Sequence, residues 1–547
     1  MIEMITHVKR IMLVSITILL FLSNLNAAAQ GTTDCSPTET SGKGFTVFIS
    51  DLHMGIGKYP NSEKWNEMED FRWEKEFGLF LDEINRIGNG KTDLVINGDL
   101  FELWQFVEDN CNYGNPNLGC TEKDALKRIQ NVLKSHESEF QLLRKFVEGP
   151  GQNRLHIVPG NHDAALLYGA VAKEVLKSIN ATPGKVCILP KGYWRSTDGL
   201  VYAEHGHQIE GDTNSYKNKW PKPFTQYKGK TYLIRTLGER FVQKYYNPFE
   251  NKYPIIDNLS EEKMGLKYGF AAEGWLVAST KDLPTFANFA ILQISADQFA
   301  SGLLGPGETG MPNYDVKIIK KNWDEKFISD LLPIMETLLP EDSIDRIVLK
   351  KIAEKNLSIK PSNLSDDQII IYCKVRSDLI ARLEEQKQTI SISECPVKTG
   401  TLSLYYMTKQ NDEVLKTHIM KSYKALPSEG NIKPPEFKVF IYSHTHKAHD
   451  DDKYTIELSS GSWAPKVFNS GAWIRVIDKD QLEELRGEKN IKKDKYILTD
   501  IALEELPSCY SFVMIEPYEN EPNAKLRYWA SGSNNSWKIS TKCKADN

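Results

Sequence analysis

Short apolar runs alternate with stretches of helical spacing through the first two hundred residues of the chain. Three runs rich in β-branched and aromatic residues predict buried strands, at residues 45–50, 93–97 and 155–159. In the segments after each of them, apolar residues recur three and four positions apart, which predicts helices at residues 69–87, 124–147 and 164–179. Strands that alternate with helices are typical of an α/β layered domain.

Later parts of the chain follow a different pattern. Residues 201–204 and 437–442 predict two more strands. After residue 453 the chain alternates between short apolar runs and turns. The runs that predict strands there are 454–458, 466–469, 473–477, 510–516 and 525–529.

The stretch between these parts is richer in helical patches. Residues 323–339 and 366–387 have helical spacing, and Gly and Pro interrupt the pattern at 302–310. We therefore expect a mostly helical insertion over residues 212–435, although several long loops with one helix pair are an alternative. The α/β domain would then consist of residues 44–211 and 436–530.

The first 29 residues predict a secretory signal peptide. His7, Lys9 and Arg10 precede an apolar run over residues 11–22, and three alanines end at Ala29. The run is short for a membrane span, which needs about 20 residues, but an uncleaved anchor is the alternative. No later stretch is comparably long and apolar, so we expect no transmembrane span after cleavage near Ala29 and a secreted or periplasmic location.

Composition excludes several classes of protein. The chain has 547 residues, of which 40% are hydrophobic and 26% are charged, as in a folded globular protein rather than a disordered, collagen-like or coiled-coil chain. Its net charge is −5 and no basic stripe is present, so nucleic acid is not an expected partner.

All eight cysteines lie beyond Ala29, and an even number in an exported chain is compatible with disulfides. Cys111 and Cys120 flank a turn-rich segment, which predicts a local bridge, although two free buried thiols are the alternative. No cluster of Cys and His has the spacing of a thiolate zinc site.

Clusters of His, Asp and Asn follow five of the predicted strands. In chain order they are Asp51 with His53, Asp99, Asn161 with His162 and Asp163, His205 with His207, and His444 with His446. The carboxyl ends of strands meet at one edge of an open α/β sheet, where ligands bind, so we expect these side chains to converge. A set of nitrogen and oxygen donors without sulfur suits divalent Mn, Fe or Zn, and one carboxylate shared by two ions has to be central, as Asp99 is.

The five motifs, in this order, resemble the calcineurin-like metallophosphoesterase family. The resemblance covers about residues 44–211 and 436–530, and it departs from the family at Ser443, where the last motif usually has Gly. It implies a four-layer α/β/β/α sandwich and two divalent metal ions whose bridging hydroxide attacks a phosphate mono- or diester. The implied substrate is a small-molecule or lipid-linked phosphoester.

The resemblance also implies a role for each site residue. Asp51, His53, Asp99 and His446 would hold one ion, and Asp99, Asn161, His205 and His444 would hold the other. His162 would protonate the departing oxygen, and Asp163 would orient its ring. His207 would either support a ligand or face the substrate.

Several residues distinguish this sequence from particular branches of the family. Purple acid phosphatases have a Tyr ligand where this chain has Glu102, so an Fe(III)–tyrosinate site is not expected. Residues 98–104 and 468–473 resemble the UDP-diacylglucosamine pyrophosphohydrolase branch, but that branch usually has Arg in place of His162 and acts on the cytoplasmic side of the membrane. The remaining hypotheses are an exported phosphoesterase, a non-catalytic envelope binding protein on the same scaffold, and, more weakly, a nuclease.

Other polar and aromatic residues carry weaker expectations. Glu102 and Trp104 either line the pocket mouth or serve packing and capping. His136 and His156 are expected in the core or on the surface, and His449 in a solvated loop over residues 447–452. The insertion leaves after His207 and returns before the strand that leads to His444, so we expect it to cap the site with its aromatic clusters at residues 220–224 and 245–249. A docking module that points away is the alternative.

Overall fold

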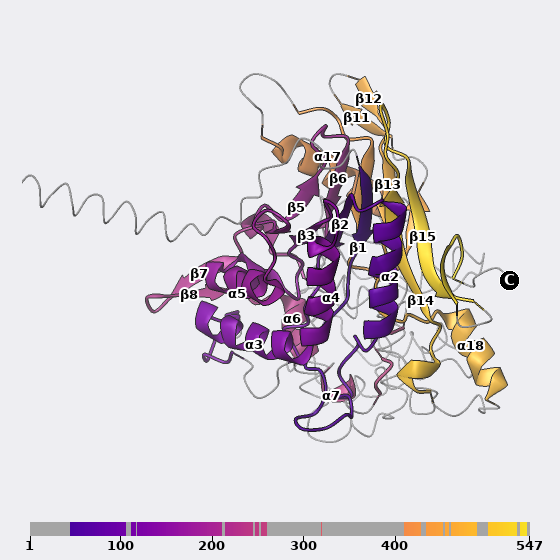
Figure 1. Ribbon diagram of the computed structural model, residues 1–547. Helices are drawn as coiled ribbons and strands as arrows, with labels where there is room; N and C mark the ends of the chain where they lie inside the picture. The colour runs from indigo at the N-terminus through magenta and orange to yellow at the C-terminus, as the bar shows by residue number, and fades with distance from the viewer. Residues whose placement is uncertain are drawn as a thin grey trace, which may run out of the picture.

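Two β-sheets lie face to face at the centre of the computed structural model, with helices on their outer sides (Figure 1). The structure describes residues 44–259, 410–489 and 501–543, together with residue 319. Short gaps within these ranges fall at 106–110, 116, 210–213, 244–246, 251–252, 257, 428–433, 452–454, 459–460 and 533–535. The predicted signal peptide and the predicted helical patches at 323–339 and 366–387 therefore lie outside the described residues.

The larger sheet has seven strands in the order β16-β15-β14-β1-β2-β3-β4. Its four parallel strands are β1 (Phe45–Ile49), β2 (Thr92–Asn97), β3 (Arg154–Val158) and β4 (Val186–Ile188). Three antiparallel strands extend it beside β1, namely β14 (Cys509–Ile515), β15 (Ala524–Ser531) and β16 (Trp537–Ser540).

The smaller sheet has five strands in the order β10-β13-β9-β6-β5. They are β10 (His449–Asp451), β13 (Lys466–Asn469), β9 (Val439–Tyr442), β6 (Val201–Glu204) and β5 (Tyr193–Arg195). Strand β9 pairs in parallel with both β6 and β13, so the segments before and after the long middle part of the chain meet in one sheet.

Alternating side chains on each strand build the layers. Phe45, Val47 and Ile49 of β1 pack on the helix side, whereas Phe48 points between the sheets, where its ring lies 5.3 Å from Trp194. Because both faces of the parallel strands are covered, most of their residues are apolar, and polar ones such as Asp93 and His156 are buried as well.

Helices cover the outer face of the larger sheet. They are α2 (Glu74–Ile87), α3 (Glu122–Ser135), α4 (Glu137–Glu148) and α5 (Gly169–Ile179). Helix α2 buries Phe77, Phe80, Leu81 and Ile84, which lie on one face of the helix. The Thr121 hydroxyl caps α3 by accepting from the backbone N–H of Asp124.

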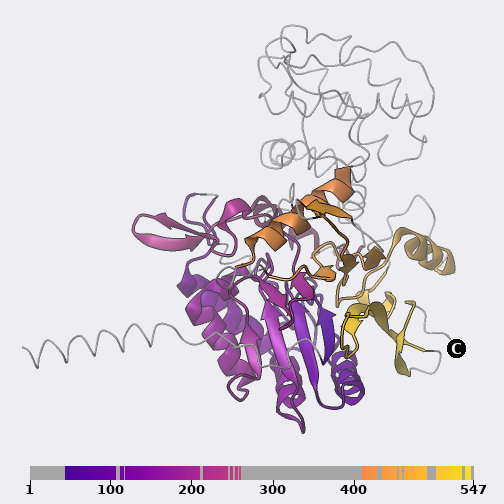
Figure 2. The same ribbon diagram turned by 90° about the horizontal axis from the view of Figure 1, so that it is seen from above.

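Helix α17 (Gln410–Ala425) covers the outer face of the smaller sheet, where Leu415 and Ile419 pack against Tyr202 and Phe440. Figure 2 shows α17 and the helices of the larger sheet on opposite sides of the two sheets. The described residues thus form the predicted α/β/β/α sandwich of four layers.

Two predicted helices are interrupted. The helix expected over 124–147 is divided at His136, whose φ of −116° and ψ of 30° let its imidazole reach buried carboxylates. The helix expected over 164–179 consists of a short 3-10 turn, η1 (Ala164–Leu167), followed by α5, with extended backbone at Tyr168. Apolar spacing continues across both breaks, which is why the pattern did not reveal them.

The strand predicted over 473–477 is wrong. Trp473 instead donates its backbone N–H to Ser50 O at 2.8 Å, and its ring stacks on Tyr510 at 4.4 Å. The apolar residues of this segment fill the core from a loop. The solvated loop predicted over 447–452 is also wrong in part, because His449–Asp451 forms strand β10 at the edge of the smaller sheet.

Part of the stretch predicted as an insertion packs into the same core. The hairpin of β7 (Phe224–Tyr227) and β8 (Lys230–Leu233) joins the loop before α3, since Gly119 N donates to Leu233 O at 2.8 Å. Short helices follow at α6 (Leu237–Phe241) and α7 (Asn247–Glu250), and Ile255, Ile256 and Leu259 are buried.

Three further described elements lie in the last hundred residues of the chain. They are the hairpin of β11 (Ile456–Leu458) and β12 (Gly461–Trp463) and helix α18 (Lys479–Glu488). Cys111 and Cys120 form the predicted disulfide, and Cys509 is bonded to Cys543. Among the described residues, no helix combines the length and apolar character that a membrane crossing requires.

Candidate metal centre

The polar motifs lie at the carboxyl ends of strands in both sheets. Asp51 and His53 follow β1, Asp99 follows β2, and Asn161 to Asp163 follow β3 in the larger sheet. His205 and His207 follow β6, and His444 and His446 follow β9 in the smaller sheet. Facing edges of the two sheets therefore bring together motifs that are almost 400 residues apart.

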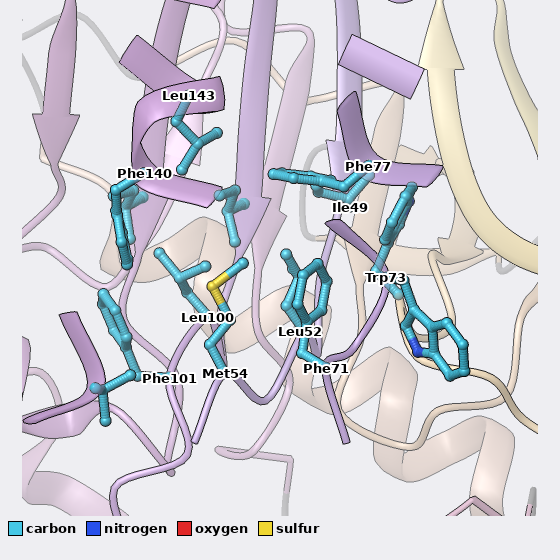
Figure 3. Close-up of a cluster of buried hydrophobic side chains, with 14 of the residues drawn as sticks. Ile49, Leu52, Met54, Phe71, Trp73, Phe77, Leu100, Phe101, Phe140 and Leu143 are labelled. Carbon is cyan, nitrogen blue, oxygen red and sulfur yellow. The ribbon is translucent and has the colours of Figure 1, made fainter. Parts of the chain in front are cut away.

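Leu52 and Met54, which alternate with Asp51 and His53, anchor the first motif. Both are fully buried, as are Leu100 and Phe101 beside Asp99. Figure 3 shows these side chains among the aromatic residues of the helix-side core. Apolar neighbours thus fix the two loops while the polar side chains between them face the site.

The backbone of the site is strained. Ten non-glycine residues of the described chain have positive φ, and five of them are candidate ligands: Asp51 (52°), His53 (48°), Asp99 (51°), His444 (71°) and His446 (54°). Such conformations cost on the order of 1 kcal/mol or more each and occur preferentially at functional sites. Ladder bonds hold two of these turns together, because the N–H groups of Leu52 and His53 both donate to Asp99 O.

Two glycines permit the close approach of the motifs. A Cβ atom on Gly98 would lie 2.2 Å from His205 Nδ1, and one on Gly160 would lie 2.2 Å from Asp99 Oδ1. Any side chain at either position would displace a candidate ligand. The glycines of the second and third motifs are therefore required by packing at the site.

Three groups of described side chains could each hold an ion: two consist of candidate ligands, and the third joins His53 to Glu102 and His162. Asp51, His53 and His446 make up the first, and Asp99, His205 and His444 make up the second. In the first, His446 Nε2 lies 3.2 Å from His53 Nε2 and 3.3 Å from Asp51 Oδ1. In the second, His205 Nε2 lies 2.8 Å from Asp99 Oδ2 and 3.0 Å from Asn161 Oδ1. Asp51 Oδ1 and His205 Nε2 are 4.0 Å apart, so the groups adjoin.

These side chains fit divalent metal ions. Asp51 Oδ1 is buried without a hydrogen-bond partner, yet imidazole nitrogens of His53, His205 and His446 lie within 4.0 Å of it. A buried carboxylate oxygen facing several imidazoles is a donor set that Mn, Fe or Zn accepts. The pairing of His446 with Asp51 and of His444 with Asp99 is the arrangement that the resemblance implied.

Electrostatics favour ionised carboxylates here. Burial opposes ionisation of Asp99, but the imidazoles of His205 and His162 lower the pKa of its carboxyl well below the ordinary value. Burial likewise opposes protonation of His205, yet the carboxylates of Asp99 and Asp51 raise its pKa to about 10. The site thus stabilises positive charge close to its carboxylates, which is the condition for binding a cation.

Glu102, rather than Asp163, contacts the ring of His162. Glu102 Oε2 accepts from Nδ1 of His162 and lies 3.1 Å from Nδ1 of His53. The expectation that Asp163 orients His162 is wrong, because its carboxylate accepts from the backbone N–H groups of Gly160 (2.6 Å) and Leu100 (2.9 Å). Asp163 therefore ties the third motif to the second.

Two further contacts fix the position and the protonation state of His162. The Trp104 ring stacks on the His162 ring with centroids 3.8 Å apart. Although burial opposes it, the Glu102 carboxylate raises the pKa of His162, which favours the protonated ring that an acid catalyst requires. Both Glu102 and Trp104 lie in the run that follows Asp99, and the three-residue spacing from Asp99 was the available signal for Glu102.

His207 lies beside the second group and not among its ligands. Its ring is 1% exposed and lies 5.4 Å from the ring of His205 and 6.3 Å from that of His444. Burial, followed by the nearby His205, lowers the pKa of His207 well below the ordinary value, so it is neutral. The Trp220 ring packs edge-on against it at 4.3 Å, which brings one of the predicted aromatic clusters to the site.

The other histidines singled out in the sequence lie outside both groups. His136 is buried among Glu69 and Glu139, and His156 is buried on β3 near Asp93. His449 lies on strand β10, where its Nε2 and the hydroxyl of Tyr442 are hydrogen-bonded at 3.0 Å.

A cavity of about 20 Å³, which has room for about one water molecule, adjoins His162 and Asn161.

Comparison with known proteins agrees with the geometry. Residues 46–266 match the model of a family described as calcineurin-like phosphoesterase. No curated protein and no solved structure matches the chain. The matched residues contain five of the seven candidate ligands, and the fold brings the other two, His444 and His446, into the same two groups. Such a domain implies metal-dependent hydrolysis of phosphoesters, and this chain carries a calcineurin-like phosphoesterase domain.

Proposed function

We propose that this chain is an exported enzyme that hydrolyses phosphate mono- or diesters with two divalent metal ions. The observation that carries the proposal is the convergence of candidate ligands from four chain segments on two groups that adjoin through Asp51 and His205. Asn161, from a fifth segment, lies 3.0 Å from His205 Nε2. The ions would be Mn, Fe or Zn, and the substrate a small-molecule or lipid-linked phosphoester.

Each of the two groups of ligands would bind one ion. Asp51, His53 and His446 would hold one ion, Asn161, His205 and His444 the other, and Asp99 would be shared. Ions bound there would neutralise phosphoryl oxygens and lower the pKa of water into the neutral range. Their ligands are held by buried backbone, so little reorganisation is required when the substrate binds.

His162 would act as the general acid. Its Nδ1 is engaged by Glu102, which leaves Nε2 to donate a proton to the departing oxygen. Glu102 fixes the tautomer and the ring orientation, and Trp104 restricts rotation of the ring by stacking on it.

Two independent features support export. The first is the signal-peptide pattern ending near Ala29. The second is the pair of disulfides, Cys111–Cys120 and Cys509–Cys543, because disulfides persist mainly in oxidising compartments. Fractionation of cells that produce the full chain, with sequencing of the mature N-terminus, tests this. Uncleaved protein in the cytoplasm would contradict it.

A substrate panel tests the activity. Purified protein would be loaded with Mn, Fe or Zn and assayed with nitrophenyl phosphate, bis-nitrophenyl phosphate and nucleotides. We expect turnover with at least one metal, and loss of that turnover on chelation. Protein that binds two metals tightly but hydrolyses none of these esters would favour the non-catalytic binding protein.

A further inference from the structure

Four buried polar side chains connect the ends of the two sheets directly beneath the candidate metal centre. Ser50 follows β1 and Asn97 ends β2 in the larger sheet, while Ser443 follows β9 and Ser470 follows β13 in the smaller sheet. None of the four is more than 1% exposed. At such depth, each polar atom needs a partner or costs stability.

The hydrogen bonds among them form one chain. Asn97 Nδ2 lies 2.9 Å from Ser443 Oγ, which lies 2.8 Å from Ser470 Oγ. Ser470 Oγ in turn lies 2.9 Å from Ser50 Oγ, and Ser50 Oγ donates to Gly471 O at 2.8 Å. The other N–H of the Asn97 amide donates to Glu204 O at 2.7 Å.

The direction of every bond follows from the count of protons. A hydroxyl has one proton, and that of Ser50 goes to the carbonyl of Gly471, which can only accept. Ser470 must therefore donate to Ser50, and Ser443 must donate to Ser470 and accept from Asn97. Because each hydroxyl donates once and accepts once, the bonds polarise one another in the same direction.

Three members of this hydrogen-bond chain lie next to or near candidate ligands in strained turns. Ser50 precedes Asp51, Asn97 lies two residues before Asp99, and Ser443 precedes His444. The carbonyl of Asn97 also accepts from Nδ1 of His205 at 2.9 Å, which directs Nε2 of that ring into the site. The hydrogen-bond chain therefore fixes the ligand-bearing turns of the two sheets relative to each other.

We propose that Ser443 is a positioning residue for the metal centre, through a hydrogen-bond chain that locks the ligand-bearing turns of the two sheets together. This inference rests on the proposed two-metal function. Ser443 is the link in these hydrogen bonds that joins the Asn97 amide to the Ser470 hydroxyl. A Gly there would leave Asn97 Nδ2 without its acceptor and Ser470 Oγ without its donor.

Metal titration of variants tests the role without using activity. Ser443→Gly, Ser443→Ala and Ser443→Thr would be titrated with Mn²⁺ and Zn²⁺ against a competing chelator, and apo-protein unfolding would be measured in parallel. Residues that orient metal ligands typically contribute 10- to 100-fold to affinity. We expect the Gly and Ala variants to bind metal about 10-fold or more weakly, and the Thr variant, which keeps the hydroxyl, to recover most of the loss.

Ser196→Ala is a matched control. Ser196 is also a buried serine, 4% exposed, and its hydroxyl accepts from Val201 N at 2.9 Å at the other end of β6. Its loss should lower stability without changing metal affinity. Wild-type metal affinity in folded Ser443→Gly and Ser443→Ala would overturn the proposal.

A double-mutant cycle gives a second measurement. If Ser443 acts through the hydrogen-bond chain, the double variant Ser443→Ala with Ser470→Ala should bind metal only slightly more weakly than either single variant. Additive losses would contradict the chain. Reduced affinity in a protein that hydrolyses no ester would support the positioning role while the hydrolase proposal fails, so the two outcomes are distinguishable.

Discussion

At the scale of single residues, the carboxylates of the site differ in their surroundings. Asp99 contacts the imidazole of His205 through Oδ2 and the backbone N–H of His162 through Oδ1. Burial opposes ionisation of Glu102, but the imidazoles of His162 and His53 lower its pKa to about 2. Asp163 accepts only from backbone amides, and burial raises its pKa to about 7. Similar side chains thus serve as a candidate ligand, an orienting group and a structural tie.

Asp99→Ala should remove both metals and nearly all turnover, because the shared carboxylate would serve two ions. Elemental analysis of the purified variant would show a fall from about two metals per chain to well below one. Asp82→Ala is the control, since Asp82 is an exposed carboxylate that pairs with Lys145. Two tightly bound metals in the Asp99 variant would exclude a shared role.

His162→Ala should reduce kcat by about 10²–10⁴-fold and leave the metal content near wild type, because general acid catalysis contributes about this much. The loss should be smaller for nitrophenyl esters than for alkyl esters, whose leaving oxygens need protonation more. Equal losses for both kinds of ester would contradict the acid role.

Glu102→Gln should reproduce part of that loss with the same dependence on the leaving group. The amide keeps the shape of the side chain but removes the charge that favours protonated His162. Kinetics with paired nitrophenyl and alkyl esters measure this. A variant with the wild-type ratio of the two rates would show that Glu102 does not act through His162.

At the scale of elements, the break between α3 and α4 supports the loop after β1. His136 at this break is fully buried, with Nε2 3.3 Å from Glu69 Oε2 and Nδ1 3.5 Å from Glu139 Oε1. Glu69 also accepts from the backbone N–H groups of Gly57 (2.6 Å) and Phe71 (2.9 Å). One ionic cluster therefore links the helix layer to the loop that continues from His53.

This cluster predicts a loss of stability at alkaline pH. Burial opposes protonation of His136, but Glu69 and Glu139 raise its pKa to about 10, against an ordinary value of 6.5. Because the folded pKa is higher, the contribution is complete below about pH 6.5 and declines as the pH rises through about 10. Urea unfolding between pH 7 and 10.5 measures it.

His136→Gln provides the comparison. Removing one partner of a buried ion pair costs about 3–5 kcal/mol, so the variant should be less stable at pH 7. Its free energy of unfolding should also vary less with pH between 7 and 10.5. An unchanged pH dependence would show that His136 is not the titrating group.

At the scale of the whole molecule, the described flanks of the long middle segment contact the end of β6, from which His205 and His207 follow. On the N-terminal side, Tyr216 stacks with Trp220, and Trp220 packs on His207. On the C-terminal side, His418 of α17 contacts the carboxylate of Glu204, the residue before His205. Both ends of the segment therefore begin near the candidate metal centre, and the cap over the substrate site stays a prediction.

Replacing residues 260–409 with a Gly/Ser linker tests the cap. The linker leaves Ile255, Ile256 and Leu259 in the core and keeps α17 on the smaller sheet. We expect metal binding and hydrolysis of small esters to persist while selectivity among larger substrates is lost, because substrate-binding walls supply specificity. An unchanged ranking of substrates in a folded, metal-loaded variant would favour a docking module instead.

The sequence determined the local features of this protein. Apolar runs predicted the parallel strands β1, β2 and β3 within one or two residues, because a strand covered on both faces consists mostly of apolar residues. The position of the Asp51–His53 and His444–His446 pairs directly after predicted strands indicated that they would converge at one edge of the sheets. Cys111 and Cys120 could be paired because so few residues separate them.

Tertiary structure decided which distant groups meet. Glu102 on one loop reaches His162 on another, whereas Asp163, adjacent in sequence, faces backbone amides. The helix breaks at His136, whose imidazole pairs with the carboxylates of Glu69 and Glu139. The spacing of apolar residues contains no information on such polar contacts. Contacts of this kind depend on side-chain direction across the packed sheets. The hydrogen-bond chain through Ser443 joins residues up to 420 positions apart, and it exists only once both sheets are assembled.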